Sequence, residues 1–132
     1  MPDQGLVSAE IVSRFLLKGE IRPSDNTVKH GAFLPSLSNL KISVFRIYNL
    51  VEEQIWALAA EKVEPARGQV IGRGDLSVAQ IVENKLKVTP DTNPISRHAN
   101  IVEWPDDRDL RAAIAKELAA LASPAIKRQA AV

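Results

Sequence analysis

The stretch ISRHANIVEWP, residues 95–105, holds the side chains best suited to chemistry in this sequence. A histidine changes its charge near neutral pH, so His98 could act as a general acid, a general base or a hydrogen-bond donor. The neighbouring Arg97 could hold an anion beside it, although adjacent residues of a strand point to opposite faces and need not converge. Spacing alone identifies no catalytic partner, so His98 is a candidate catalytic residue only.

Alternation along this stretch predicts which side chains face a site. Ala99 and Ile101 are small or apolar and predict the core side of a strand, whereas His98 and Asn100 share the opposite side. Trp104 ends that second side and is either a core residue, which we favour, or an exposed binding anchor. Together with an arginine from an earlier strand, the candidate binding residues are Arg46, Arg97, His98, Asn100 and Trp104.

Arg46 interrupts the apolar side of LKISVFRIYNL, residues 40–50, which is the clearest strand in the sequence. Apolar residues occupy both faces of this strand, which predicts a central position in a sheet. A charged side chain there must be paired or bind something. The simpler interpretation is a salt bridge to a carboxylate, and the alternative is an anchor for an anion or a substrate. Because the strands of Arg46 and His98 both lead into helices, we predict that they are neighbours running the same way.

Most common catalytic and cofactor motifs are missing from the sequence. IGRGDL, residues 71–76, has two glycines but neither the third glycine nor the lysine of a phosphate-binding loop, so we interpret it as a tight turn before a helix. The RGD triplet within it is interpreted as a chance tripeptide. The absence of cysteine excludes disulfides, thiolate metal sites and a cysteine nucleophile. With His30 and His98 as the two histidines, we expect no metal site and no cofactor.

Composition narrows the class of partner. The net charge is +1, from 17 Lys and Arg against 16 Asp and Glu, which argues against a dedicated nucleic-acid binder. Nucleic-acid binding would require one basic face made of Arg14, Lys18, Arg22, Lys29 and His30. No apolar run approaches the roughly 18 residues of a membrane span, and the N-terminus is not a secretory signal. We therefore expect a cytoplasmic protein without a membrane partner.

Hydrophobic periodicity and turn residues divide the chain into short elements. Strands are predicted at 40–50, 69–74, 86–91 and 97–104, and helices at 51–63, 78–85 and 105–122. Residues 10–18 fit either a short helix or a strand, because their apolar residues match both periods. Residues 20–40 are typical of a connecting loop, with one short strand at 27–34.

Helix caps and apolar stripes refine these predictions. Asn49 with Glu52, and Ser77 with Gln80, match the capping-box pattern at the start of a helix. The last helix is predicted to turn one stripe inward, made of Leu110, Ile114, Leu118 and Leu121. The elements together predict an α+β fold in a single small domain over residues 1–132, with a mixed β-sheet packed by two or three helices including a long C-terminal helix. Residues 1–9 and 123–132 are predicted to be flexible.

Three segments carry a resemblance: SVFRIYNLVEEQIWALA (43–59), GRGDLSVAQIVENKLKVTPD (72–91) and RHANIVEWP (97–105). In this order, over residues 12–122, the chain resembles a recurring type of small bacterial protein to which no activity is assigned. The resemblance implies a bacterial source and a single-domain fold, and it implies no mechanism. Arg46, Arg97, His98 and Trp104 are among the residues that carry it.

Two functions are compatible with these observations. The first is an accessory or binding protein that acts through contact with a macromolecular partner, expected to be a protein encoded nearby. The alternative is a small enzyme on a nucleotide or another phosphorylated substrate, in which His98 acts as acid or base and Arg46 or Arg97 holds the anion.

Overall fold

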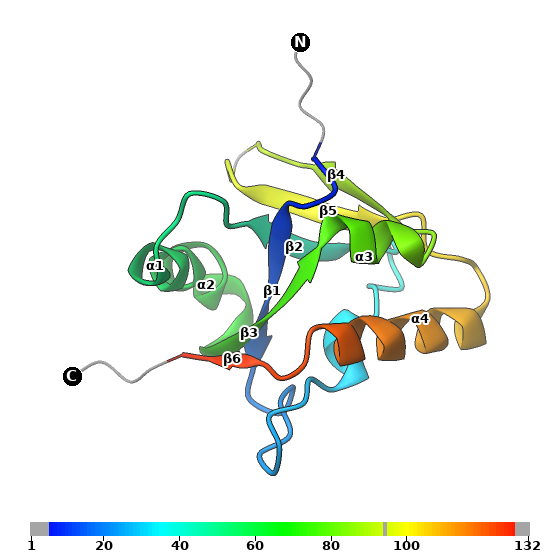
Figure 1. Cartoon of the computed structure of the whole chain (residues 1–132), viewed down its shortest axis with the longest axis horizontal. Helices are drawn as coiled ribbons and strands as arrows, with labels where there is room; N and C mark the ends of the chain where they lie inside the picture. Colours follow the sequence, from blue (N-terminus) through cyan, green and yellow to red (C-terminus); the bar gives the residue numbers. More distant parts are fainter. Residues whose placement is uncertain (1–5, 94, 129–132) are drawn as a thin grey trace.

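The computed structural model describes residues 6–93 and 95–128, and within them six strands form one sheet in the order β4-β5-β2-β1-β3-β6 (Figure 1). The strands are β1 Ile11–Leu17, β2 Ile42–Arg46, β3 Val70–Ser77, β4 Lys87–Pro90, β5 His98–Val102 and β6 Ile126–Lys127. The helices are α1 Glu52–Lys62, α2 Glu64–Arg67, α3 Val78–Glu83 and α4 Arg108–Leu121, with the 3-10 helix η1 His30–Phe33.

The α+β class and the single small domain predicted from the sequence are confirmed. Every described pair of neighbouring strands is antiparallel, so the prediction of a mixed sheet is wrong. The predicted common direction of the Arg46 and His98 strands is also wrong, because β2 and β5 pair antiparallel. The helices that follow β2 lead the chain past β1 to β3, so a helix after each strand does not imply a shared direction. The four α-helices exceed the predicted number because α2 adds a single turn.

Two hydrophobic cores lie on the two faces of the sheet. α1 and α2 cover the smaller core, whose buried residues are Phe15, Phe45, Ile55, Ala59, Val63 and Val70. α3, α4 and η1 cover the larger core, which includes Phe33, Val44, Ile81, Ile101 and Leu118. Figure 1 shows α1 and α2 on one side of the sheet and α4 with η1 on the other. The sheet is therefore the middle layer, and β1 and β2 are buried on both of its faces.

β1 resolves the ambiguity of residues 10–18 in favour of a strand. Val12 and Leu16 pack into the larger core, whereas Phe15 packs into the smaller one with its ring centroid 5.5 Å from that of Phe45. Apolar residues at both periods are what a strand requires when both of its faces are covered. The double pattern that made the segment ambiguous is thus the signature of its central position.

The N-cap of α1 lies two residues later in the chain than predicted. Val51 is the N-cap, and its backbone N–H donates to Oε1 of Gln54 at 3.0 Å. Asn49 instead lies in the preceding turn with a left-handed φ of 59°, a conformation that asparagine tolerates better than most residues. The cap predicted at Ser77 is confirmed, because Ser77 and Gln80 exchange the two reciprocal hydrogen bonds at the start of α3.

α4 is rotated relative to its predicted stripe. Leu118 is buried, but Leu110 is 55 % exposed and Leu121 also lies at the surface. The buried face is completed by Ala115 and Ala119, because these small side chains let the helix approach η1 closely. In place of the short strand predicted at 27–34, the chain makes one isolated bridge between Ile21 and Val28 and then forms η1.

The C-terminal segment, which the sequence predicts to be flexible from residue 123, makes backbone contacts with the sheet and a loop as far as Arg128. The N–H of Ala125 donates to the carbonyl of Asn26 at 2.7 Å. Ile126 and Lys127 form β6 on the edge of β3, and the N–H of Arg128 donates to the carbonyl of Ile71 at 2.9 Å. At the other end, the carbonyl of Ser8 accepts from Ala79 at 3.0 Å. Residues 1–5 and 129–132 lie outside the described residues.

An ion pair between a buried arginine and an exposed glutamate fastens α1 to the sheet. The guanidinium of Arg73, a residue only 5 % exposed, donates to both carboxylate oxygens of Glu52 at 2.8 and 3.0 Å. Its Nε lies 3.2 Å from Asp75, and its central carbon lies 5.1 Å from the centre of the Trp56 ring. The RGD triplet, interpreted from the sequence as a chance tripeptide, therefore supplies two members of a structural network.

Candidate functional site

Arg46 and His98 lie on neighbouring strands, as predicted, but on opposite faces of the sheet. His98 pairs in register with Phe45, and their ring centroids are 5.4 Å apart on the face covered by α1. Arg46 is the next residue, so its side chain points to the other face. There its guanidinium donates to both oxygens of Glu10 at 2.6 and 3.0 Å. The salt-bridge interpretation of Arg46 is confirmed, and the two candidates do not share a pocket.

Arg46 and Arg97 instead meet around Tyr48, which is 50 % exposed. The guanidinium carbons of Arg97 and Arg46 lie 4.6 and 5.2 Å from the centre of the Tyr48 ring. Arg97 also donates to the carbonyls of Arg46 at 3.2 Å and Tyr48 at 2.7 Å. We refer to Arg46, Tyr48 and Arg97 as the Tyr48 cluster.

Two other predicted binding residues are buried. Trp104 is 6 % exposed, packs in the larger core and donates its Nε1–H to the carbonyl of Ile101 at 3.1 Å. It therefore has almost no surface with which to contact a partner. Asn100 is also buried, and its amide donates to Oδ2 of Asp91 at 3.1 Å. Its role is to hold the Asp91 carboxylate.

His98 lies between a hydroxyl and a carboxylate group. Its Nδ1 is 3.2 Å from the carbonyl oxygen of Asp91 and 3.4 Å from Oδ2 of the same residue. Both oxygens can only accept, so Nδ1 carries the proton of the neutral ring. Nε2 is then free to accept from the hydroxyl of Ser43, which lies at 3.0 Å. Sequence reasoning missed Ser43 and Asp91, because Ser43 reaches His98 from β2 and Asp91 from the residue just after β4.

Ser43 and His98 open into one pocket of about 340 Å³ between the sheet and the end of α1 with α2. We call it the His98 pocket. Its apolar wall is formed by Phe15, Phe45, Val63 and Ile95, and its basic side chains besides His98 are Arg14, Lys62 and Arg67. No acidic residue is among the described residues that line it. The pocket thus combines an aromatic wall with several cationic groups.

Arg14 lies where β1 and β2 separate. The two strands pair only from Val12 to Ser13 on β1, and the Arg14 side chain then fills the gap. Its Nε donates to the carbonyl of Ala32 at 2.9 Å and its Nη1 to the carbonyl of Ser43 at 3.0 Å. Among the described residues Arg14 forms no salt bridge. Burial and the nearby charge of Arg67 lower the pKa of Arg14 to about 10, so its surroundings disfavour the charge that it carries.

Arg67 reaches the pocket from α2. This one-turn helix has proline in its first turn and ends at Gly68, whose positive φ of 105° lets the chain turn back toward β3. Arg67 donates to the carbonyl of Phe15 at 3.2 Å, and its Nη2 lies 3.6 Å from a carboxylate oxygen of Glu20. Glu20 is thus the one acid near the guanidinium groups of both Arg14 and Arg67 among the described residues.

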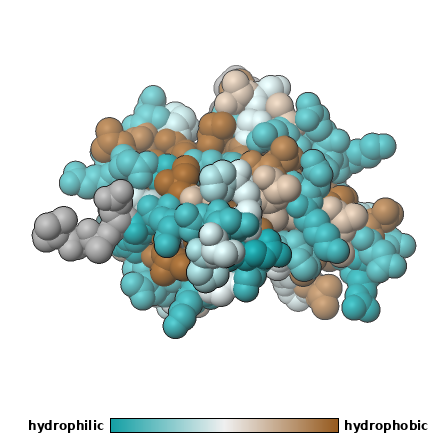
Figure 2. Space-filling view, turned by 60° about the horizontal axis from the view of Figure 1, so that its bottom comes forward, coloured by the Kyte–Doolittle hydropathy of each residue, from teal (hydrophilic) through white to brown (hydrophobic). Residues whose placement is uncertain are grey.

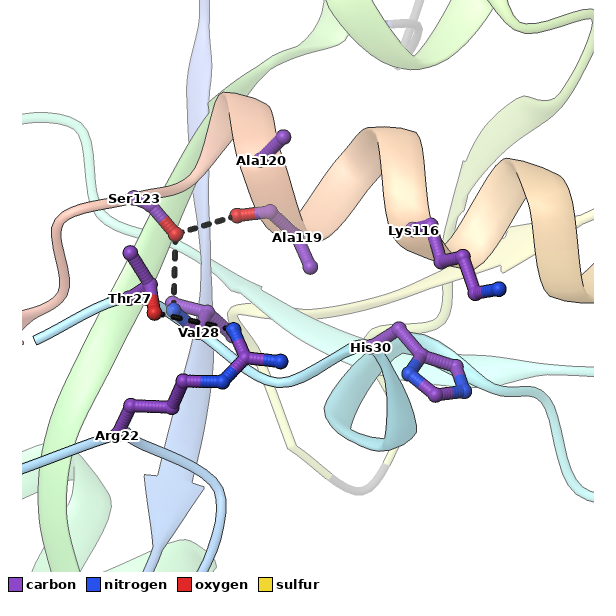
Figure 3. A pocket seen from close by; sticks show the side chains of 8 residues that line it. All are labelled: Arg22, Thr27, Val28, His30, Lys116, Ala119, Ala120 and Ser123. Atoms are coloured by element: carbon purple, nitrogen blue, oxygen red, sulfur yellow. Dashed lines mark hydrogen bonds between the residues drawn. The ribbon is translucent and has the colours of Figure 1, made fainter.

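A second hollow, of about 380 Å³, lies between α4 and the loop that precedes η1. Figure 3 shows Arg22, His30 and Lys116 around it. The Thr27 and Ser123 hydroxyls at its edge are already engaged in hydrogen bonds. Arg22 and His30 also line a third hollow with Lys29, so three members of the predicted basic face do gather, but Arg14 belongs to the His98 pocket. The hollow beside α4 has no phenylalanine, tyrosine or tryptophan in its lining, and its two hydroxyls are held by other hydrogen bonds.

The surface offers no broad apolar face in the view of Figure 2, where hydrophobic residues form separate patches among hydrophilic ones. Over residues 6–93 and 95–128, three or more His, Cys, Asp or Glu side chains nowhere gather in a way that could hold a metal ion. In the same residues, each helix is too short or too polar to cross a membrane.

Comparison with known protein families, with curated proteins and with solved structures found no match. Function must therefore be inferred from the residues of this chain alone.

Proposed function

We propose that the protein binds a small anionic ligand with an aromatic or other apolar body in the His98 pocket. The observation that carries this proposal is Arg14, a partly buried guanidinium that donates only to carbonyl oxygens and shares the one nearby acid, Glu20, with Arg67. A desolvated cation without a carboxylate is costly, and a bound anion would offset that cost. A pocket of about 340 Å³ suits a ligand near the lower end of the usual size range.

Each part of the pocket fits one part of such a ligand. The apolar lining offers a surface on which a flat group can pack, made by the exposed Ala66 and the partly buried Ile95 over the largely buried rings of Phe15 and Phe45. Arg14 has N–H groups beyond the two already donated, and Arg67 and Lys62 add positive charge at the same opening. An aryl phosphate or an aryl carboxylate is the simplest molecule that satisfies both parts.

Phenyl phosphate provides the test, with titration followed by NMR and by calorimetry. We expect it to bind, and we expect inorganic phosphate and phenol to bind more weakly because each has only half of the required chemistry. Arg67→Gln should weaken binding about 10-fold or more, since a hydrogen bond to a charged group contributes about 1.5–3 kcal/mol. Arg22→Gln, in the second hollow, is the matched control and should leave the affinity unchanged.

Two outcomes would overturn the proposal. If phenyl phosphate does not shift the resonances of the pocket, or if Arg22→Gln weakens binding as much as Arg67→Gln, the His98 pocket is not the site. Arg14→Gln is a second variant, whose folding is checked first by circular dichroism, because Arg14 also fills the gap between β1 and β2.

A second candidate function, contact with a protein partner, is favoured by the Tyr48 cluster. A half-exposed tyrosine held between two arginines is the kind of preordered side chain on which interfaces depend. Arg97 is in no salt bridge with the described residues, so an acidic segment of a partner would complete it. A partner encoded nearby should bind the wild-type chain and lose affinity at least about 10-fold with Tyr48→Ala. Equal affinity would remove this candidate.

A further inference from the structure

We propose that Ser43, His98 and Asp91 form a hydrolytic site, and that the ligand of the His98 pocket is an ester with an anionic group. This inference rests on the proposed function, because the pocket must first hold an anion. It goes beyond binding by assigning a nucleophile, a base and a positioning residue.

Three adjacent strands place these groups in the order that acyl transfer requires. Ser43 is on β2 and His98 on β5, and Asp91 follows directly after β4, with its N–H donating to the carbonyl of His98 at 2.8 Å. The hydroxyl lies 3.0 Å from Nε2, and the carboxylate lies 3.4 Å from Nδ1. A nucleophile on one ring nitrogen and a carboxylate on the other is the geometry of a Ser–His–Asp triad.

The proton positions match the same roles. The backbone carbonyl of Asp91, at 3.2 Å, and its carboxylate, at 3.4 Å, together place the proton of the neutral ring on Nδ1, so Nε2 is the basic atom and faces the Ser43 hydroxyl. Asn100 donates to the Asp91 carboxylate at 3.1 Å and holds it in place. Asp91 acts through His98, so it is a positioning residue.

The pocket supplies the remaining requirements. Ser43 and His98 both line it, so a bound ester can reach both. The guanidinium of Arg14 lies 3.0 Å from the carbonyl oxygen of Ser43, beside the nucleophile. Its free N–H groups can stabilise the negative oxygen that forms during attack. Arg67 and Lys62 lie farther along the opening and would hold the anionic group of the substrate.

The reaction balances without any other reagent. The Ser43 oxygen attacks the ester carbonyl carbon while His98 Nε2 takes the hydroxyl proton, and the carbonyl electron pair moves to its oxygen. The tetrahedral intermediate collapses, the ester C–O bond breaks, and the leaving alcohol takes the proton from His98. Water then attacks the acyl group on Ser43 and gives its proton to His98. Breakage of the Ser43–acyl bond returns that proton to Ser43 and releases the acid.

Two readouts test the proposal on the full chain. A fluorophosphonate probe should add to Ser43, as located by mass spectrometry of peptides. The chain should also hydrolyse 4-nitrophenyl hydrogen succinate, an anionic ester, faster than neutral 4-nitrophenyl butyrate. Ser43→Ala and His98→Gln should each lower kcat at least about 100-fold. Ser38→Ala is the matched control on an exposed serine and should change neither readout.

Asp91→Asn separates positioning from a merely structural role. We expect kcat to fall at least about 10-fold with little change in KM, because the ester still binds while the imidazole is less well oriented. Binding of phenyl phosphate by Ser43→Ala separates this inference from the proposed function. If phenyl phosphate binds but no adduct or turnover depends on Ser43, the hydrolytic site is refuted and the binding function is retained. If phenyl phosphate does not bind and turnover still depends on Ser43, the binding function fails alone.

Discussion

Removal of residues 126–132 should destabilise the protein, although these residues end the chain. The truncation takes away β6 and the side chain of Arg128. Arg128 donates to Glu64 of α2 at 2.9 Å, and its guanidinium carbon lies 5.9 Å from the centre of the Trp56 ring in α1. The segment therefore ties the two helices above the His98 pocket to the edge of the sheet.

The size of the effect follows from these contacts. The partly exposed ion pair contributes up to about 1 kcal/mol, the stacking on Trp56 about 0.5–1 kcal/mol, and each lost backbone hydrogen bond about 0.5–1.5 kcal/mol. The sum is about 2–4 kcal/mol. For a domain of this size it corresponds to a Tm lower by roughly 6–15 °C.

The measurement is thermal and urea unfolding, followed by circular dichroism and tryptophan fluorescence, of two truncated chains. The chain that lacks residues 129–132 is the control, so the difference between the two isolates Ile126, Lys127 and Arg128. In the full chain, Arg128→Gln should lower the Tm by only part of this difference, because it removes the side-chain contacts and keeps the backbone hydrogen bonds of β6. Equal Tm values for the two truncations would refute the reasoning and would mean that β6 does not stabilise the sheet.

Three further predictions concern the rest of the scaffold. Leu118→Ala should lower the free energy of unfolding by about 2–5 kcal/mol in urea titrations, whereas the exposed Leu110→Ala should change it by less than about 0.5 kcal/mol; similar costs would contradict the observed rotation of α4. Gly74→Ala should cost about 1–3 kcal/mol, because its Cβ would lie 3.1 Å from a packed side chain, and an unchanged midpoint would count against that packing. The hydrogen bond from the N–H of Val70 lowers the pKa of Glu64, so the Glu64 carboxylate stabilises the fold fully above its usual pKa of 4.5 and loses this effect as pH falls through the lower folded pKa. Glu64→Gln should therefore make the free energy of unfolding less dependent on pH in acid. An identical pH dependence of the two proteins would show that Glu64 does not contribute.

Much of the fold could be predicted because burial leaves a local pattern. The strands at 40–50, 86–91 and 97–104 and the cap at Ser77 depend on residues close together in sequence, and each is present in the structure. The direction of the strands could not be predicted, because it depends on where the chain goes after each helix. The rotation of α4 was missed because alanines pack against η1 where leucines were expected.

Of the candidate site, the sequence predicted His98 but not Ser43 or Asp91, because their proximity depends on contacts between distant segments. His98 stands out in the sequence by its chemistry alone, whereas Ser43 is one of several serines and Asp91 lies within a turn-like segment. Only the register of β2, β5 and the end of β4 brings the three together, and register is a long-range property. Arg14 was visible as a basic residue, but the separation of β1 and β2 that exposes it to the pocket leaves no signal in its own segment.

The distribution of carboxylates distinguishes structural arginines from functional ones in this chain. Arg46 pairs with Glu10, Arg73 with Glu52, and Arg128 with Glu64. The fold therefore brings an acid to each of these partly or largely buried guanidinium groups. Arg14 differs from these three: like Arg97 and Arg111 it donates only to carbonyl oxygens, and it also lies near the further positive charge of Arg67. A sequence with 16 acidic residues had the means to neutralise it. Because this incompletely compensated charge lies beside the hydroxyl that faces His98 Nε2, we propose that Arg14 binds a ligand in addition to filling the gap between β1 and β2.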